Sequence, residues 1–355
     1  MPNVHTPTGH LIVMHGAERI PLLRVAAYNA ELRDEEGFIG DRASVGAFRS
    51  ILDDWRARLR KVGEDPLGDL DTHAITKKKL DRILQDGDPQ AAGLIHATVE
   101  DFAQQLSAVA ARFLRQKAWK DAKRIVLGGG LRASRVGELA IGRASVILKA
   151  AGHAVDLVPI RYHPDQAGLI GTVHLVPSWI FAGFDGVLAV DIGGSNIRVG
   201  IVDLHLKKAR DLSAVRVYAS ELWKHADEKP KRGEAVERLI TMLVDLVERA
   251  HRQGISLAPF IGVGCPGVIE QDGTIDHGGQ NLPGNWESSR FNLPQLIRVG
   301  VPKIGGHPTH VVMHNDAVVQ GLSEAPFMRD VDTWGVLTIG TGLGNACFVN
   351  VQADA

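Results

Sequence analysis

A strand, a short glycine-rich turn and a returning strand occur twice in this chain of 355 residues. The first unit comprises the strand 187–190, the turn Asp191–Asn196 and the strand 197–204; the second comprises the strand 335–339, the turn Gly340–Gly344 and the strand 345–351. Apolar runs on both sides of a turn of small residues predict β-hairpins. Two hairpins of one design favour a chain that contains a duplicated α/β domain.

Helix and strand signals alternate through much of the remaining chain, which is typical of an α/β fold. Asp88 and Pro89 supply an N-cap and a first-turn proline for a helix whose apolar residues recur at steps of three and four up to Phe113. Strands are expected at 123–127, 154–160, 260–264 and 310–313, and helices at 134–151 and 236–250. The first 85 residues have a weaker pattern, which predicts a short strand at Leu11–Met14 and then exposed helices and loops.

Both hairpin turns have the composition of a phosphate-binding loop. Backbone N–H groups approach a phosphate closely where no Cβ blocks the ligand, and glycine adopts positive φ at little cost. Asp191 stands at the first turn, and a carboxylate beside phosphates usually needs a divalent cation, for which magnesium is the natural candidate. A second interpretation stays open, in which each turn is only a tight hairpin turn.

Two further segments suit catalysis and ligand binding. Asp316 follows an apolar strand beside Asn315, and strand ends in α/β folds point side chains into the ligand crevice, so Asp316 is the candidate general base. An equally good interpretation makes Asp316 the N-cap of a helix expected at 317–324. Asn281 and Trp286 combine an amide with an aromatic face in one rigid loop, which suits a polyhydroxylated ligand, although such a segment is more often only a loop.

Composition excludes several other classes of protein. Lys+Arg 40 against Asp+Glu 41 gives a net charge of -1, so no electrostatic attraction to nucleic acid or to anionic lipid is expected. No uninterrupted apolar run approaches the ~20 residues of a membrane span. The two cysteines, Cys265 and Cys347, make neither a disulfide scaffold nor a four-cysteine zinc site. We therefore expect a reduced, soluble, cytoplasmic protein.

Competing ligand motifs are also absent from the sequence. No glycine-rich segment ends in the Gly-Lys-Ser or Gly-Lys-Thr of a Walker loop. The turn Gly128–Gly130 follows a strand but lacks the G-x-G-x-x-G spacing of a dinucleotide site. His10, His163 and His314 show no metal-ligand spacing, which favours structural or surface roles for them.

Taken together, these segments resemble the ROK family (repressor, open reading frame, kinase) of sugar kinases. The motifs that carry the resemblance stand in family order and are Asp191-Ile192-Gly193-Gly194-Ser195-Asn196-Ile197-Arg198-Val199-Gly200, Gly262-Val263-Gly264-Cys265-Pro266-Gly267-Val268, Asn281-Leu282-Pro283-Gly284, Asn315-Asp316 and Gly340-Thr341-Gly342-Leu343-Gly344. The resemblance implies an α/β fold of the two-domain actin-like ATPase type, with duplicated ribonuclease H-like domains.

The family's remaining half precedes these motifs instead of following them. Gly87-Asp88-Pro89-Gln90-Ala91, Arg124–Gly130 and Asp165–Gly171 are similar to the family's C-terminal motifs. This order predicts a circular permutation, with new ends in a surface loop after the second hairpin. A larger α/β domain is then expected over 1–164 plus 320–355, and a smaller one over 165–319.

The resemblance implies ATP-dependent phosphorylation of a hexose or an N-acetylated amino sugar, with magnesium as cofactor and no zinc. Asp316 would be the catalytic base, and Asn281, Asn315, Gly267 and His10 would bind the sugar. The nucleotide contacts would be Asp191, which would also hold magnesium, together with Gly193, Gly194, Ser195, Asn196, Arg198, Gly340, Thr341, Gly342, Gly344, Gly128, Gly129 and Gly130. The partner expected is a small-molecule sugar, with neither nucleic acid nor membrane, and the resemblance favours a homodimer.

Three departures from the family pattern concern the sugar site and zinc. Pro7 stands where the family's Glu-x-x-Gly-His motif has its glutamate, so that only Gly9-His10 matches, and the family's zinc cysteines are missing. Asn285 interrupts the usual Asn-Leu-Pro-Gly-Trp. Two alternatives therefore stay open: a non-catalytic regulator that binds sugar or ATP, for which Ile75–Leu84 is the nearest imitation of a helix-turn-helix, and a decayed kinase that binds ATP only.

Overall fold

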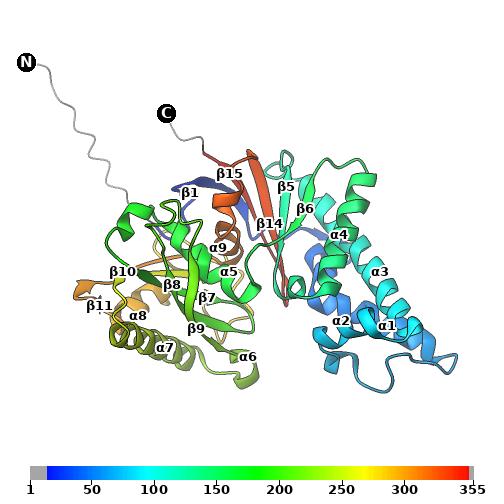
Figure 1. Ribbon diagram of the computed structural model, residues 1–355. Helices are drawn as coiled ribbons and strands as arrows, with labels where there is room; N and C mark the ends of the chain where they lie inside the picture. The colour runs from blue at the N-terminus through cyan, green and yellow to red at the C-terminus, as the bar shows by residue number, and fades with distance from the viewer. Residues whose placement is uncertain (1–13, 352–355) are drawn as a thin grey trace, which may run out of the picture.

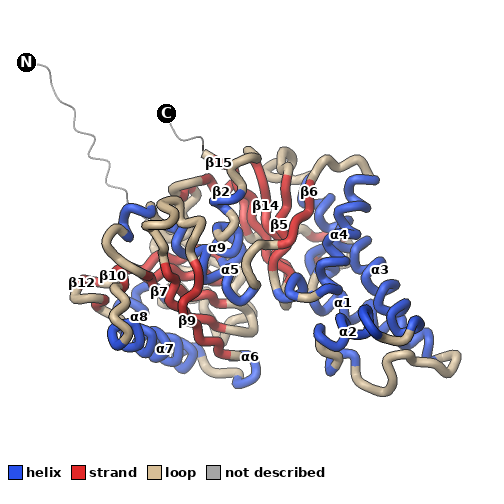
Figure 2. Tube along the Cα trace, in the orientation of Figure 1, coloured by secondary structure: helices blue, strands red, loops and turns tan. Residues whose placement is uncertain are grey.

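The computed structural model describes residues 14–351, and it consists of two α/β lobes joined side by side. Each lobe is built on a twisted β-sheet, and helices cover the outer face of each sheet (Figure 1). Figure 2 shows the strands of the two sheets on either side of a middle layer that contains the helices α5 and α9. His10 and residues 11–13 of the predicted strand Leu11–Met14 lie outside the described residues, and Met14 belongs to no strand.

The first sheet has six strands in the order β1-β2-β15-β14-β5-β6. Its strands are β1 (Arg19–Ile20), β2 (Leu23–Tyr28), β5 (Arg124–Gly128), β6 (Asp156–Pro159), β14 (Thr333–Ile339) and β15 (Leu343–Asn350). β15 runs antiparallel to both β14 and β2, whereas β5 is parallel to β14 and β6 is parallel to β5.

The second sheet has five strands in the order β13-β10-β7-β8-β9. Its strands are β7 (Gly186–Ile192), β8 (Ile197–Asp203), β9 (Arg216–Trp223), β10 (Leu257–Cys265) and β13 (His310–Asn315). β8 runs antiparallel to β7 and β9, β10 is parallel to β7, and β13 is parallel to β10. Five strands of the first sheet, β2-β15-β14-β5-β6, therefore repeat the order and the directions of β9-β8-β7-β10-β13. The two-residue strands β3 (Arg33–Asp34) and β4 (Gly37–Phe38) form one ribbon, and β11 (Lys303–Ile304) and β12 (His307–Pro308) form another.

Three hydrophobic cores follow from this layering. The helices are α1 (Val45–Arg60), α2 (Lys77–Asp86), α3 (Pro89–Leu114), α4 (Arg135–Ala150), α5 (Pro164–Gly171), α6 (His225–Glu228), α7 (Arg232–Arg252), α8 (Leu293–Gly300) and α9 (Asp316–Leu322). The first core joins α1, α3 and α4 to the first sheet, and the third joins α7 and α8 to the second sheet. The middle core lies between the sheets and includes Leu169 of α5 and Val318 of α9. α9 packs against strands of both sheets, and α5 packs against α9 and the second sheet, so the two helices join the lobes in one unit.

The elements predicted from local signals are present, with small shifts at their ends. Asp88 caps α3 by accepting hydrogen bonds from the backbone N–H groups of Gln90 and Ala91, and Pro89 occupies its first turn. Phe102 and Phe113 on the apolar face of α3 are fully buried, and each such side chain contributes about 2–3 kcal/mol to stability. Both glycine-rich hairpins are also formed, as β7–β8 and β14–β15.

The prediction for the first 85 residues is wrong in one respect, because this segment contributes to the core. β2 completes the first sheet beside β15, and Phe48 and Leu52 of α1 are buried against α3. The weak pattern of α1 has a physical cause in Arg56, a fully buried cation inside an otherwise amphipathic helix. No helix among residues 14–351 is long and apolar enough to span a membrane.

Candidate active site

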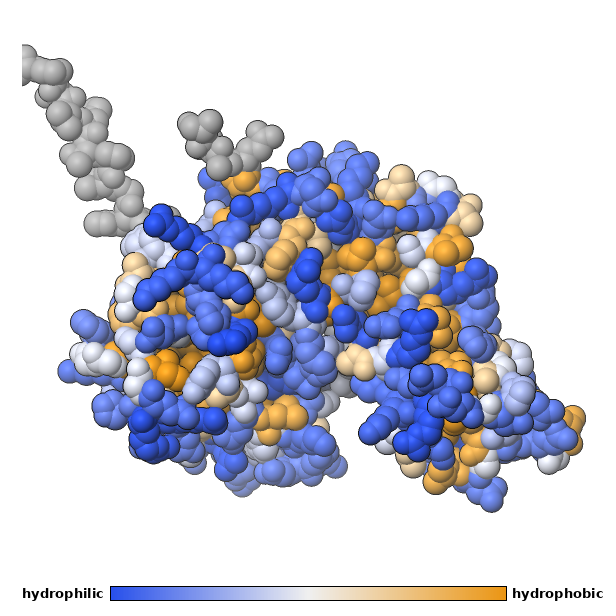
Figure 3. Space-filling model, in the orientation of Figure 1, coloured by the Kyte–Doolittle hydropathy of each residue, from blue (hydrophilic) through white to orange (hydrophobic). Residues whose placement is uncertain are grey.

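The two glycine-rich turns, which lie far apart in the sequence, touch in the folded protein. Ser195 at the tip of the β7–β8 hairpin places its Oγ 3.0 Å from Oγ1 of Thr341 at the tip of the β14–β15 hairpin. Because one tip belongs to each lobe, the contact spans the boundary between them. In the space-filling view the two lobes are separated by a notch along the lower edge of the molecule (Figure 3).

Three tip glycines are required neither by backbone conformation nor by packing. Gly193, Gly340 and Gly342 do not have positive φ, so the backbone of these turns does not require glycine there. A Cβ added at Gly193 or Gly340 would meet its nearest described neighbour only at 3.6 or 3.7 Å, and one at Gly342 would meet none within 4 Å. The missing Cβ atoms therefore leave space beside backbone N–H groups, which is the property of a phosphate-binding turn.

The third glycine turn has the opposite character. Gly129 has a φ of 87°, and a Cβ there would overlap the backbone of Ile339, with 2.5 Å to its carbonyl carbon. Gly128 pairs with Thr338 in the ladder of β5 and β14, so the turn Gly128–Gly130 lies beside the second hairpin. The structure therefore brings all three predicted glycine turns to one edge of the two sheets.

The first turn is held by backbone contacts and by one buried histidine. The N–H group of Gly193 donates to the carbonyl of Asn196 at 2.8 Å, which closes the turn. Nε2 of His225 lies 2.9 Å from the carbonyl oxygen of Gly193, and the N–H group of Ala226 donates to the carbonyl of Ser195. His225 was not predicted, because an isolated histidine carries no sequence signal for such a role.

Asp191 and Arg198 face each other across the first hairpin. Nη1 of Arg198 lies 3.5 Å from Oδ2 of Asp191, and Nη2 lies 2.5 Å from Oδ1 of Asp165 at the start of α5. Asp191 is almost completely buried, and a Cβ on Gly168 of α5 would come within 2.5 Å of its Oδ1. Burial raises the pKa of Asp191, and the Arg198 guanidinium opposes that shift. Asp165 begins the segment Asp165–Gly171, which the sequence analysis identified as a family-like motif. Its ion pair with Arg198 depends on tertiary structure.

Asn315, and not Asp316, is the N-cap of α9. Oδ1 of Asn315 accepts hydrogen bonds from the N–H groups of Ala317 and Val318, and its Nδ2 donates to the carbonyl of Gly267 at 3.0 Å. Asn315 therefore fixes the start of α9 and ties it to the loop after β10. Asp316 is the first residue of the helix, so its carboxyl group is not used as the cap.

The carboxyl group of Asp316 has an acidity unusual for an aspartate. Burial, and next the nearby negative charge of Asp191, raise the pKa of Asp316 to about 7, while backbone N–H groups of Ala317 and Asp316 oppose the shift. A carboxylate with a pKa near neutrality is suited to accept a proton at physiological pH.

The loop 281–286 is only partly as predicted. Asn281 is exposed and lies against the first turn, since a Cβ on Gly194 would be 3.0 Å from its Cβ. Trp286 is 1% exposed, stacks near Phe291 and donates from Nε1 to the carbonyl of Pro283. The aromatic face expected for a ligand is therefore part of the core of the second lobe.

Gly267 lies beside Asn315, as the motif spacing suggested, with a φ of 102° and its carbonyl directed at the Asn315 amide. His163 caps α5, and Nε2 of the buried His314 lies 3.2 Å from the carbonyl oxygen of Ala17. Burial lowers the pKa of His314 to about 4, so this imidazole is neutral at physiological pH. Of the three histidines considered in the sequence, His163 and His314 lie among the described residues, and both have structural contacts.

No group of three or more His, Cys, Asp or Glu side chains that could hold a metal occurs among residues 14–351. Magnesium needs no such cage, because it keeps several waters and binds one or two carboxylates together with substrate phosphates. The acidic pair Asp191 and Asp316, which is close enough for the charge of one to shift the pKa of the other, has the oxygen chemistry that such an ion takes.

These features define a two-lobed α/β protein with two facing glycine-rich turns and an acidic pair beside them. Residues 187–354 match the model of the ROK family. The family match implies an α/β fold of the actin-like ATPase type. No protein of curated function matches the sequence.

Solved structures show the same likeness over part of the chain. A candidate sugar kinase from Cytophaga hutchinsonii ATCC 33406 is 21% identical over 46% of this chain and 48% of its own, with a TM-score of 0.33. A candidate N-acetylmannosamine kinase from Listeria monocytogenes is 26% identical over 46% and 47%, with a TM-score of 0.32. The ROK hexokinase from Thermus thermophilus is 22% identical over 48% and 49%, with a TM-score of 0.31. The matched part thus spans about half the length of each of these proteins.

Proposed function

We propose that this protein phosphorylates a hexose or an N-acetylated amino sugar with ATP. The observation that carries the proposal is the meeting of Ser195 and Thr341, which brings two open glycine turns together. The match of residues 187–354 to the model of the ROK family supports the same reaction class.

Asp316 is the proposed general base. Its raised pKa suits it to take the proton of an attacking sugar hydroxyl, and Asn315 positions it by fixing the first turn of α9. Phosphoryl transfer depends on positioning and on charge neutralisation more than on covalent chemistry of the protein. The rate would therefore depend on how rigidly α9 and the two turns are held.

The nucleotide phosphates would lie against the N–H groups of the two hairpin turns, and the turn Gly128–Gly130 would contact the nucleotide near its adenosine. Magnesium would be held by Asp191, directly or through water, and would neutralise phosphate charge there. Arg198 keeps Asp191 oriented through its ion pairs and places a positive charge close to the same position.

The sugar would be bound by Asn281, by the Gly267 loop and by Asn315. The exposed amide of Asn281 beside Gly194 supports a contact near the transferred phosphate. Both amide atoms of Asn315 already bind backbone groups, so its contribution to sugar binding would come mainly from holding Gly267 and Asp316. The role of His10 and the homodimer stay predictions.

The chain order is proposed to be a circular permutation of the family order. The strand β2 from the start of the chain fills the place beside β15 that β9 fills beside β8, so the third strand of one repeat precedes its first two. The domains 1–164 plus 320–355 and 165–319 follow from this order, with α5 and α9 between them.

Release of ADP from Mg-ATP across a panel of sugars tests the function. The panel contains glucose, mannose, fructose, N-acetylglucosamine and N-acetylmannosamine, and Asp316→Asn is the control. Release that depends on one sugar and is lost in the variant would establish the kinase. Silence across the panel from folded protein that binds ATP would favour the non-catalytic regulator or a decayed kinase.

A further inference from the structure

Lys77, the first residue of α2, directs its ammonium group at the third glycine turn. Its Nζ donates to the carbonyl of Gly130 at 2.5 Å, and a Cβ on Gly130 would lie 3.3 Å from that nitrogen. Thr76 caps the helix and so fixes the backbone from which Lys77 extends. Lys77 is exposed, and this contact holds its ammonium group beside the turn.

A small apolar pocket lies next to this cation. Six of its lining residues are Phe48, Arg49, Thr72, Lys77, Leu131 and Val136. Leu131 directly follows the turn Gly128–Gly130, and the N–H group of Val45, which also lines the pocket, donates to the carbonyl of Gly340 at 3.1 Å. The pocket therefore adjoins two of the three glycine turns. Its free volume of about 30 Å³ is too small for a nucleobase, and Lys77 lies at its edge.

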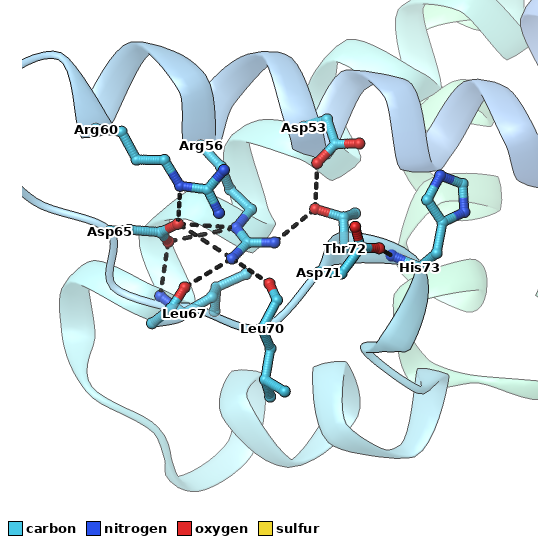
Figure 4. Close-up of polar contacts among 10 residues, drawn as sticks. Asp53, Arg56, Arg60, Asp65, Leu67, Leu70, Asp71, Thr72 and His73 are labelled. Carbon is cyan, nitrogen blue, oxygen red and sulfur yellow. Dashed lines mark hydrogen bonds and ion pairs between the residues drawn. The ribbon is translucent and has the colours of Figure 1, made fainter.

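A second cation, Arg49, lines the same pocket. Its Nη1 donates to the carbonyl of Thr72 at 2.9 Å. The loop that carries Thr72 is in turn fixed by the buried Arg56, whose guanidinium donates to Thr72 Oγ1 and to the carbonyls of Gly68 and Leu70 (Figure 4). Arg49 is thus held in place by a rigid scaffold.

Burial lowers the pKa of Lys77 and the charge of Arg49 lowers it further, whereas Asp165 and Asp81 oppose the shift. Asp165 acts on Lys77 more strongly than Arg49 does, so carboxylates already offset the repulsion between the two cations. An ammonium group has three donors, so Lys77 can keep its contact with Gly130 and still donate to a phosphate oxygen.

We propose that Lys77 binds a phosphate group of the nucleotide at the turn Gly128–Gly130. This inference rests on the proposed ATP-dependent function and adds to it a residue outside the five ROK-like motifs. Lys77 would contribute to nucleotide affinity and would not touch the sugar or the reacting hydroxyl.

Calorimetric titration of Lys77→Ala with ATP, ADP and adenosine, at one magnesium concentration and one ionic strength, tests the proposal. Lys78→Ala is the matched control, because Lys78 is the next residue of the same helix and is exposed. The loss of a charge-assisted hydrogen bond predicts about tenfold weaker binding of ATP and ADP, with adenosine binding and Lys78→Ala within about twofold of the unchanged protein. Lys77→Gln, which keeps a donor for Gly130 without the charge, should behave as Lys77→Ala does.

Three outcomes would overturn the proposal. These are unchanged ATP binding in both Lys77 variants, an equal loss for adenosine, which would indicate a change of pocket shape, and an equal loss in Lys78→Ala. If the unchanged, folded protein binds no ATP, the proposed function itself fails, and this result differs from the other three. Should Lys77→Ala not fold, the Gln variant decides the question.

Discussion

The hydroxyl groups of Ser195 and Thr341 lie 3.0 Å apart, although 146 positions separate the two residues in the sequence. One hydroxyl belongs to each lobe, so their contact links the two glycine-rich turns. A double-mutant cycle with Ser195→Ala and Thr341→Val should give a coupling energy of about 0.5–1 kcal/mol in denaturant unfolding. Additive effects of the two substitutions would show that the hydroxyls do not interact in solution.

Asp316→Asn should abolish sugar-dependent ADP release while ATP binding stays nearly unchanged. In the unchanged protein, a base with a pKa of about 7 is active only when deprotonated, so kcat/KM should fall about tenfold per pH unit below pH 7. A pH–rate profile between pH 5 and 9 measures this limb. A profile that stays flat down to pH 5 would remove Asp316 from the proposed role.

The same carboxyl group should make stability depend on pH. Because the folded pKa of Asp316 is about 7 and the pKa of an unperturbed aspartate is 3.8, the folded state binds the extra proton between these values. Its contribution to stability is therefore lost as pH rises from about 4 to about 7. Asp316→Asn removes this penalty, so its melting temperature relative to the unchanged protein should rise from pH 5 to pH 8. An unchanged difference across that range would contradict the raised pKa.

Gly342→Ala should weaken ATP binding with little effect on stability, whereas Gly129→Ala should lower stability. A Cβ at Gly342 meets no described atom within 4 Å, so its effect on stability should stay within about 0.5 kcal/mol while the KM for ATP rises. Alanine at position 129 must adopt a φ of 87° and overlaps Ile339, which should cost about 2–4 kcal/mol. Thermal unfolding and ATP titration of both variants distinguish a ligand-facing glycine from a structural one.

Asn315→Ala should lower both stability and turnover. It removes the N-cap of α9 and the hydrogen bond to Gly267, a loss of about 1–3 kcal/mol in unfolding free energy. Asn315→Ser keeps a capping oxygen but cannot reach as far as an amide, so it should recover most of the stability and less of the turnover. Equal turnover in the Ser variant and the unchanged protein would show that the Gly267 contact does not position Asp316.

Most secondary structure was predictable because its causes are local. The cap at Asp88 and the apolar spacing of α3 act within one helix, and the hairpins β7–β8 and β14–β15 pair neighbouring segments. The weak pattern at the start of the chain concealed β2, whose partner β15 lies at the opposite end of the sequence. Pairing across such a distance leaves little local trace.

Some features of the candidate site were likewise predictable from the sequence, and others depend on tertiary packing. The glycine-rich turns, Asp191 and the Asn315-Asp316 pair were found from residue types and spacing, because phosphate binding and proton transfer require those groups. The burial of Trp286, the ion pair of Arg198 with Asp165 and the ammonium of Lys77 at Gly130 were not predictable, since each depends on which elements pack together. Asp316 shows both contributions. The sequence by itself determined that a carboxylate begins a helix after a buried strand. Only the tertiary structure, by partly burying that carboxylate near Asp191, decided that its pKa lies near 7.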